Sequence, residues 1–150
     1  MIKEVNSEEE MRTFGAAIGS VLIGGEIIEL IGDIGSGKTT MVKGIAVGLD
    51  IDEYVQSPSF TINRVYSGRN SLTLAHYDFY RLDDAGIMAN ELSEVVGDPQ
   101  TVTVIEWGGV VDGVLPKDRL TININTTSEN SRRITFNHGG PVSQMSEERL

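Results

Sequence analysis

The first third of the chain alternates between two hydrophobic periods, and each period predicts a different element. Residues 1–22 predict a strand followed by a helix, whose apolar positions recur at helical spacing. Ser7 stands at the expected N-cap, and Glu10 follows three residues later, which is the spacing of a capping box. The apolar face of this helix is predicted to consist of Met11, Phe14, Ala17, Ile18 and Val21.

A second strand and helix follow a turn at Gly24-Gly25. Residues 26–31 alternate and then become continuously apolar, as a strand entering a parallel sheet does. A glycine-rich loop comes next, and after it a second helix is predicted, with Gly48 as its C-cap. Its apolar face is predicted to consist of Met41, Val42, Ile45, Ala46 and Leu49.

The remaining residues predict mainly strands. Residues 102–105 read as a buried strand, and residues 83–96 as a short, irregular helical region. Residues 139–150 are rich in Gly, Ser and Glu and predict a flexible C-terminal tail. Two hairpins are also predicted, from residues 62–66 with 72–77 and from residues 120–124 with 133–136.

The loop between the second strand and its helix carries the clearest chemistry. Gly32-Asp33-Ile34-Gly35-Ser36-Gly37-Lys38-Thr39 fits G-x-x-x-x-G-K-[ST], the phosphate-binding loop of nucleotide triphosphatases. Glycines let successive backbone N–H groups point at phosphates, and the following helix N-terminus adds partial positive charge. We expect Lys38 to reach the β- and γ-phosphates, Thr39 to ligate Mg²⁺, and Thr40 to contact the α-phosphate. The residues expected to contact nucleotide are Gly32, Asp33, Gly35, Ser36, Gly37, Lys38, Thr39 and Thr40.

Strand, glycine loop and helix in this order predict an α/β fold, a P-loop NTPase-like three-layer sandwich. Its central sheet is expected to be mixed and mainly parallel, with antiparallel hairpins. Residues 1–138 are predicted to form a single P-loop ATPase domain. A Rossmann loop is excluded, because no third glycine follows Gly35-Ser36-Gly37 at the required spacing. The plainer alternative is a glycine-rich turn before an amphipathic helix.

Two acidic residues are candidates for handling the metal and the attacking water. Glu106 ends the strand at residues 102–105, which is the Walker B layout with Glu in place of Asp. Asp78 also follows a strand and could take the water-orienting or a second metal role. The alternatives are an exposed acid at a strand end for Glu106 and an ion pair with Arg81 for Asp78.

Two other features leave two interpretations each, and the histidines leave one. Trp107, the single tryptophan, either stacks near the nucleotide or is buried in the core. Ser57-Pro58-Ser59-Phe60 is either a switch segment that senses the γ-phosphate or a plain loop. His76 and His138 are isolated from each other and the chain has no cysteine, so no zinc site is expected and His76 reads as a hydrogen-bonded structural residue.

Composition narrows the functional classes. The chain has 150 residues and a formal net charge of −10, from 22 acidic and 12 basic residues. Such a charge disfavours direct DNA or RNA capture and fits either solubility alone or docking onto a basic protein surface. No apolar stretch resembles a signal peptide or a membrane span, so we expect a cytoplasmic protein with no membrane association.

Four segments together resemble the TsaE (YjeE) family, small bacterial ATPases required for threonylcarbamoyladenosine formation on tRNA. The likeness covers roughly residues 5 to 136. The segments are Gly32 to Thr40, Ser57-Pro58-Ser59-Phe60, His76-Tyr77-Asp78-Phe79-Tyr80-Arg81, and Glu106-Trp107. The first defines only a superfamily, whereas the H-x-D-x-Y-R block and the E-W pair are more specific.

The resemblance implies roles for further residues. Thr39 and Glu106 would coordinate Mg²⁺, Asp78 would matter for hydrolysis, and Trp107 would lie near the nucleotide. Ser7 would approach the base, and an arginine of the C-terminal hairpin, Arg133 or alternatively Arg132, would contact nucleotide. Two departures stand out: Ser59 replaces the usual threonine, and Gly108-Gly109 follow Glu-Trp where an acidic residue is common.

The expected function is therefore a Mg²⁺-dependent ATPase subunit of the tRNA threonylcarbamoyladenosine (t6A) machinery, which modifies position 37. Its cofactors would be ATP and Mg²⁺. The resemblance implies TsaD and TsaB as partners and tRNA contact only through that complex. The alternatives are a small-molecule kinase and a nucleotide-sensing switch. The kinase is disfavoured because residues 83–96 contain no basic residue for a lid. The chain also lacks an Asn-Lys-x-Asp signature, so a preference for guanine nucleotides is unsupported.

Overall fold

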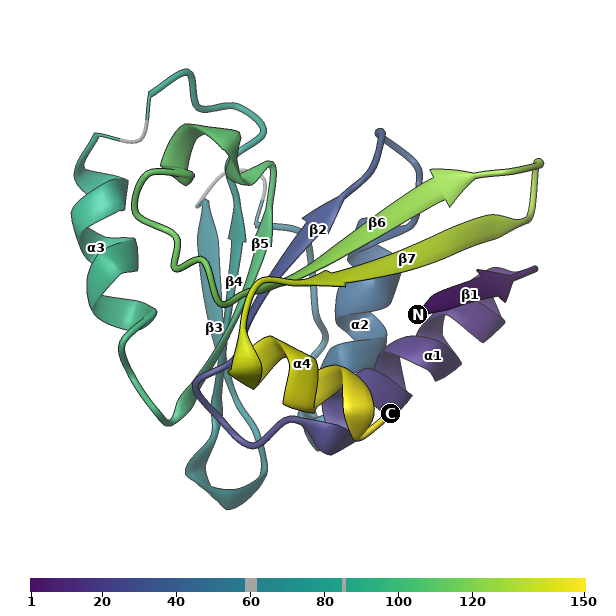
Figure 1. Ribbon diagram of the computed structural model, residues 1–150, viewed down its shortest axis with the longest axis horizontal. Coiled ribbons are helices and arrows are strands. Elements are labelled where there is room, and N and C mark those ends of the chain that lie inside the picture. Colours follow the sequence, from purple (N-terminus) through teal and green to yellow (C-terminus); the bar gives the residue numbers. More distant parts are fainter. Residues whose placement is uncertain (59–61, 85) are drawn as a thin grey trace.

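A seven-stranded sheet runs through the computed structural model, with helices on both faces (Figure 1). The structure describes residues 1–58, 62–84 and 86–150. The strands are β1 (Ile2–Val5), β2 (Ile27–Ile31), β3 (Asn63–Ser67), β4 (Thr73–Asp78), β5 (Thr101–Glu106), β6 (Leu120–Thr126) and β7 (Arg132–His138). The helices are α1 (Glu8–Val21), α2 (Lys38–Gly48), α3 (Ile87–Val95) and α4 (Pro141–Glu148), with short 3₁₀ turns η1 (Arg69–Ser71) and η2 (Gly108–Val111).

The strand order is β1-β7-β6-β2-β5-β4-β3, so the strand before the glycine loop is central. β2 pairs in parallel with β5 and β6, and β4 pairs in parallel with β5. β3 and β7 are antiparallel to β4 and β6, which confirms both predicted hairpins. The α/β class and the mixed sheet with antiparallel hairpins are confirmed, and the sheet is parallel in its middle.

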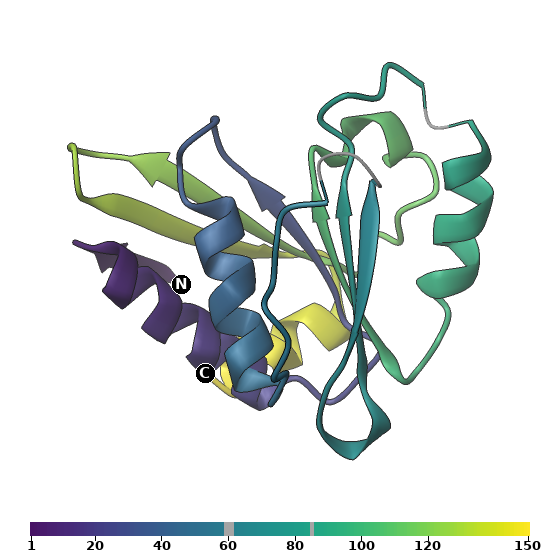
Figure 2. The same cartoon turned by 180° about the vertical axis from the view of Figure 1, so that it is seen from behind.

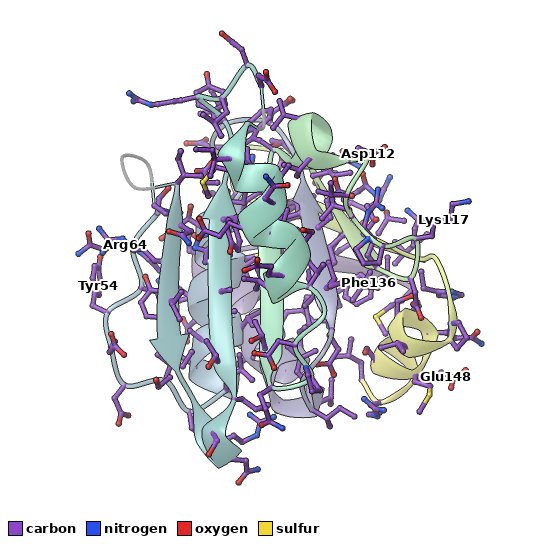
Figure 3. The ribbon with its side chains drawn as sticks, turned by 90° about the vertical axis from the view of Figure 1, so that its left-hand side faces the viewer. Tyr54, Arg64, Asp112, Lys117, Phe136 and Glu148 are labelled. Carbon is purple, nitrogen blue, oxygen red and sulfur yellow. The ribbon has the colours of Figure 1, made fainter. Side chains whose placement is uncertain are left out.

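Each face of the sheet has its own apolar core. Alternate β5 residues face opposite sides, so Val102 and Val104 join the core beneath α1 and α2, while Ile105 joins the one beneath α3. Figure 2 shows α1 and α2 side by side on the first face. Figure 3 looks at the sheet from the α3 side, with Arg64 at the β3 edge. Two cores around one sheet give the three layers.

Helices α1 and α2 pack at unusually short range, because glycines line their contact. A Cβ on Gly48 would lie 2.2 Å from the Ala16 carbonyl oxygen, and one on Gly19 would lie 2.2 Å from that of Ile45. The predicted apolar face of α1 was wrong in one respect: Ala17 is exposed, and Gly15 and Gly19 are buried instead. Gly48 was also wrongly predicted as a C-cap, because the cap is Leu49.

Residues 139–150 differ from the expected flexible tail, because Pro141–Glu148 form α4. The Asp118 carboxylate accepts hydrogen bonds from the backbone N–H groups of Val142 and Ser143, both at 2.9 Å. It therefore caps the helix from a distant loop, and Leu150 packs against the larger core. In the described parts of the chain, no helix is both long and apolar enough to cross a membrane.

Candidate active site

One pocket of about 590 Å³ lies at the carboxyl edge of the parallel strands. The elements around it converge from the whole chain: the N-terminus of α1, the glycine loop, the ends of β4 and β5, and the β6–β7 turn. Its lining is Ser7, Glu8, Met11, Ile34, Gly35, Ser36, Gly37, Lys38, Thr39, Thr40, Ser57, Asp78, Tyr80, Arg81, Glu106, Trp107, Glu129, Asn130 and Arg132. This edge is where open α/β sheets bind ligands.

The glycine loop forms the floor of the pocket. Gly35 and Gly37 have φ values of 80° and 108°, in the left-handed region that favours glycine. Helix α2 begins at Lys38, so its N-terminus opens into the pocket, lined by residues 35–40. Gly32 and Asp33, predicted as nucleotide contacts, do not line the pocket; their carbonyls accept hydrogen bonds from Lys38 Nζ instead.

Lys38 is held between the loop and an aromatic ring. Its side chain is largely buried, and Nζ lies 4.5 Å from the centroid of the Trp107 ring. Burial lowers the pKa of Lys38, although the charges of Glu106, Asp78 and Asp33 oppose that change. The same three acids show that negative charge converges on this lysine.

Glu106 and Asp78 lie next to each other at the ends of adjacent parallel strands, where they are directly in register. Glu106 is 3 % exposed, and its Oε2 lies 2.6 Å from Nε2 of His76. Asp78 is half-buried; its Oδ1 accepts a 3.0 Å hydrogen bond from the Tyr80 N–H. The alternative reading of Glu106, an exposed acid at a strand end, is excluded, because this carboxylate is buried at the pocket wall.

Trp107 lines the pocket and is only partly buried, packed against the smaller core. The backbone at Trp107 is left-handed, with φ 58° and ψ 47°, a conformation rarely adopted by a bulky side chain. This turn directs the chain away from β5 directly after Glu106. The ring is half-buried, and its centroid lies 4.9 Å from that of Tyr80. Trp107 therefore lies beside the candidate nucleotide pocket, and its stacking on a nucleotide stays a prediction.

The other end of the pocket joins α1 to the β6–β7 turn. Ser7 caps α1, as predicted, by accepting a 3.1 Å hydrogen bond from the Glu10 N–H. Of the two candidate arginines, the structure brings Arg132 to the pocket, whereas Arg133 pairs with Glu4 at 2.9 Å on an exposed surface. Arg133, one of the two candidates, therefore does not line the pocket, because neighbouring strand residues point to opposite faces.

The Ser57–Phe60 segment is only partly described. Ser57 lines the pocket, and its Oγ donates to Asp78 Oδ2 at 3.3 Å. Pro58 is buried. Ser59 and Phe60 lie outside the described residues, so the switch interpretation stays a prediction there.

Hydroxyl and carboxylate oxygens at the pocket suit a hard divalent cation. Thr39 and Glu106 both line it, and oxygen ligands are those that Mg²⁺ prefers. Within residues 1–58, 62–84 and 86–150, no three His, Asp or Glu side chains gather as a metal cage. Mg²⁺ is typically bound by one or two carboxylates together with substrate phosphates, and Glu106 and Asp78 can supply the carboxylates.

Several pocket residues escaped the sequence prediction. Tyr80 was part of a recognised motif but had no role assigned, and Arg81 was named only as an alternative ion-pair partner of Asp78. Glu129 and Asn130 reach the pocket only because the β6–β7 turn lies beside the glycine loop, for which the sequence has no local signal. Glu8 and Met11 reach the pocket from the N-terminal end of α1, and Ile34 belongs to the glycine loop but was not named as a contact.

Comparison with known proteins finds relatives over most of the chain. A family model described as threonylcarbamoyl adenosine biosynthesis protein TsaE matches residues 5–134. The chain is 40% identical over 133 residues to the tRNA threonylcarbamoyladenosine biosynthesis protein TsaE of Treponema pallidum, covering 86% of this chain and 94% of the relative. The protein of the same name from Bacillus subtilis is 38% identical over 131 residues, covering 84% and 78%.

A solved structure extends the likeness to the fold. The crystal structure of Bacillus subtilis YdiB superposes with a TM-score of 0.82 at 31% identity, and the match covers 99% of this chain and 91% of that one. Sequence, fold and the residues around the pocket therefore lead to one conclusion. This chain belongs to the TsaE family, whose members take part in threonylcarbamoyladenosine biosynthesis on tRNA.

Proposed function

We propose that this chain is a Mg²⁺-dependent ATPase subunit that acts with TsaD and TsaB in forming t6A at position 37 of tRNA. One observation carries the proposal: a phosphate-loop lysine, Lys38, shares a single pocket with the acids Asp78 and Glu106. A lysine at a helix N-terminus recognises phosphate, and acids opposite it handle metal and water. The work would take place in the cytoplasm, where tRNA is modified.

The glycine loop would bind the triphosphate through its backbone. The N–H groups at the start of α2 and the Lys38 ammonium provide positive potential at the pocket floor. Burial of Lys38 strengthens its attraction for a phosphate oxygen, since the interaction is less screened there. Ser7 and the β6–β7 turn would enclose the nucleoside end.

Thr39 and Glu106 would hold Mg²⁺ beside the phosphates. When bound, the ion would neutralise charge on the phosphate oxygens. Glu106 suits this role because it is buried and already fixed by a hydrogen bond, so little freedom is lost on binding.

Asp78 would place the water that attacks the γ-phosphate in line with the leaving oxygen. Its carboxylate is oriented by the Tyr80 N–H and by Ser57, and it has access to the pocket. Loop amides and Lys38 would stabilise the charge that develops on the phosphoryl oxygens. The water would lose its proton as phosphate and ADP form.

Turnover by the chain alone is expected to be slow. The Arg132 guanidinium donates to five backbone carbonyls, those of Gly35, Ser36, Ser128, Glu129 and Ser131, so it is poorly placed to act as an arginine finger. Partner binding would alter this rate, and ATP turnover would reset the complex. A net charge of −10 favours reaching tRNA through protein partners over direct capture.

Steady-state ATP hydrolysis, with and without TsaB–TsaD, tests the proposal. We expect slow turnover that changes when the complex is added, and co-elution of the three proteins that depends on ATP. Replacing Lys38 by alanine should abolish nucleotide binding. Equal rates with and without the complex would contradict regulation by partners, and phosphorylation of a metabolite would favour a kinase.

A further inference from the structure

A buried histidine next to Glu106 has no part in the proposed chemistry. His76 lies on β4, between β3 and β5, and its side chain is fully buried. It is in register with Val104, two residues before Glu106 on the neighbouring strand. The alternation of both strands therefore puts the imidazole and the carboxylate on the same face of the sheet, the face covered by α2.

The contact is short and has a defined direction. His76 Nε2 lies 2.6 Å from Glu106 Oε2, and the two side chains are 0 % and 3 % exposed. A carboxylate can only accept, so Nε2 carries the hydrogen and donates it. Among the described residues, Nδ1 has no hydrogen-bond partner, so Glu106 is the polar anchor of this ring.

This single bond leaves the other carboxylate oxygen available. A glutamate side chain has three rotatable bonds, and its torsions are costly to fix when a ligand binds. Because Glu106 also lines the pocket, the oxygen that His76 does not engage is the one that can face it. Hydrogen bonds of this kind orient metal-binding carboxylates and strengthen the site.

We propose that His76 is a positioning residue: its Nε2–H fixes one oxygen of Glu106 so that the other meets Mg²⁺ or its water shell. This inference rests on the proposed function, since it assigns a support to one of its metal ligands. His76 acts through Glu106 and touches neither nucleotide nor metal.

Two amide substitutions test whether a hydrogen-bond donor at the position of His76 Nε2 is needed, or whether any polar side chain at residue 76 is enough. In His76→Gln the amide nitrogen can occupy the place of Nε2, whereas in His76→Asn it corresponds to Nδ1 and is too short to reach Glu106. Mn²⁺ binding is titrated by electron paramagnetic resonance in the presence of a non-hydrolysable ATP analogue. We expect His76→Asn to weaken Mn²⁺ binding about 10- to 100-fold, and His76→Gln to stay within about threefold of the wild type.

Nucleotide affinity without metal is the internal control. In EDTA, fluorescence of the single tryptophan should report equal analogue affinity for the wild type and both variants. In turnover, the effect should fall on kcat at saturating Mg²⁺·ATP more than on the metal-free dissociation constant. Leu74→Val, a buried change on the same strand and face, should leave Mn²⁺ affinity unchanged.

A second measurement uses the wild type and so does not depend on a variant that folds. With only two histidines, the Nε2–H resonance of His76 can be assigned, and it should shift when Mg²⁺ is added to the nucleotide-bound chain. No shift, equal Mn²⁺ affinity of His76→Asn and wild type, or equal losses in His76→Gln, His76→Asn and Leu74→Val would each overturn the inference. A wild type that bound no nucleotide would overturn the proposed function and this inference with it.

Discussion

The Nε–H group of Arg132 donates a hydrogen bond to the carbonyl oxygen of Ser36, with 3.0 Å between nitrogen and oxygen, and this bond links β7 to the phosphate loop. The two residues are 96 positions apart in the chain. Because a trans peptide points its C=O and N–H in opposite directions, holding the Ser36 carbonyl directs the Gly37 N–H away from Arg132. The arginine thus helps to orient the loop as well as bounding the pocket.

Replacing Arg132 by lysine should weaken nucleotide binding. A single ammonium cannot reach both the loop and the β6–β7 turn, so several charge-assisted hydrogen bonds are lost. At about 1.5–3 kcal/mol for such bonds, an affinity loss of about tenfold or more is expected by calorimetry with an ATP analogue. Arg133→Lys is the matched control, since its exposed pair with Glu4 contributes little. Equal losses in both variants would contradict this role for Arg132.

Asp78→Asn should slow hydrolysis without preventing ATP binding. The amide keeps the shape of the side chain and can still accept from the Tyr80 N–H, but it lacks the carboxylate that places the water. Turnover is expected to fall on the order of 10²-fold while the dissociation constant for the analogue stays nearly constant. Asp84→Asn, which changes an acid outside the pocket lining, is the control. If Asp78→Asn lost ATP binding to the same extent as turnover, the role of Asp78 would be in nucleotide binding and not in hydrolysis.

Two substitutions at Trp107 isolate the strain in its backbone. Trp107→Gly and Trp107→Ala both remove the ring, but only glycine adopts a φ of 58° without cost. We expect Trp107→Gly to be more stable than Trp107→Ala by about 1 kcal/mol in urea unfolding. Equal midpoints would indicate that the turn after Glu106 relaxes in the variants.

Gly48→Ala should separate α1 from α2. The added Cβ would meet the Ala16 carbonyl oxygen at 2.2 Å, and neither backbone can yield without moving a helix. Overpacking of this kind costs about 1–3 kcal/mol, measured as a lower midpoint of thermal or urea unfolding. Gly113→Ala adds the same group where nothing lies within 4 Å, and its stability should change by less than about 0.5 kcal/mol. A Gly48→Ala variant as stable as Gly113→Ala would disprove the tight contact.

Docking of α4 should weaken in acid through Asp118. Burial alone would raise the pKa of Asp118, but hydrogen bonds from Ser143 and Val142 hold it below its ordinary value of 3.8. A lowered folded pKa means that the stabilisation is present above 3.8 and is lost as the pH falls through the folded value. Asp118→Asn should therefore be less stable than the wild type by about 1 kcal/mol at pH 7, with the gap closing in acid. A gap independent of pH would show that the charge is not involved.

The sequence predicts local elements and the phosphate loop well, because each depends on neighbouring residues. From the sequence, Arg132 and Arg133 can only be predicted to point to opposite faces of a strand. Which of them reaches the pocket depends on the register of β7 against β6. The helix α4 escaped prediction because its cap, Asp118, is 24 positions from Val142. The pairing of His76 with Glu106 likewise requires β4 to lie beside β5, which no single segment specifies.

Arg69 has a consequence for how the pocket can change shape. From the turn between β3 and β4, its guanidinium donates to the last carbonyls of both α1 and α2: those of Gly19, Ser20 and Leu22 from the first and Gly48 from the second. The opposite ends of the same two helices carry Ser7 and the phosphate loop. Because Arg69 joins their C-terminal ends and glycines allow close contact along their length, we expect α1 and α2 to move as one unit. The distance between Ser7 and the phosphate loop would then stay nearly constant. Closure around a nucleotide would then fall to the other walls of the pocket, the loops that carry Ser57, Tyr80 and Trp107 and the β6–β7 turn.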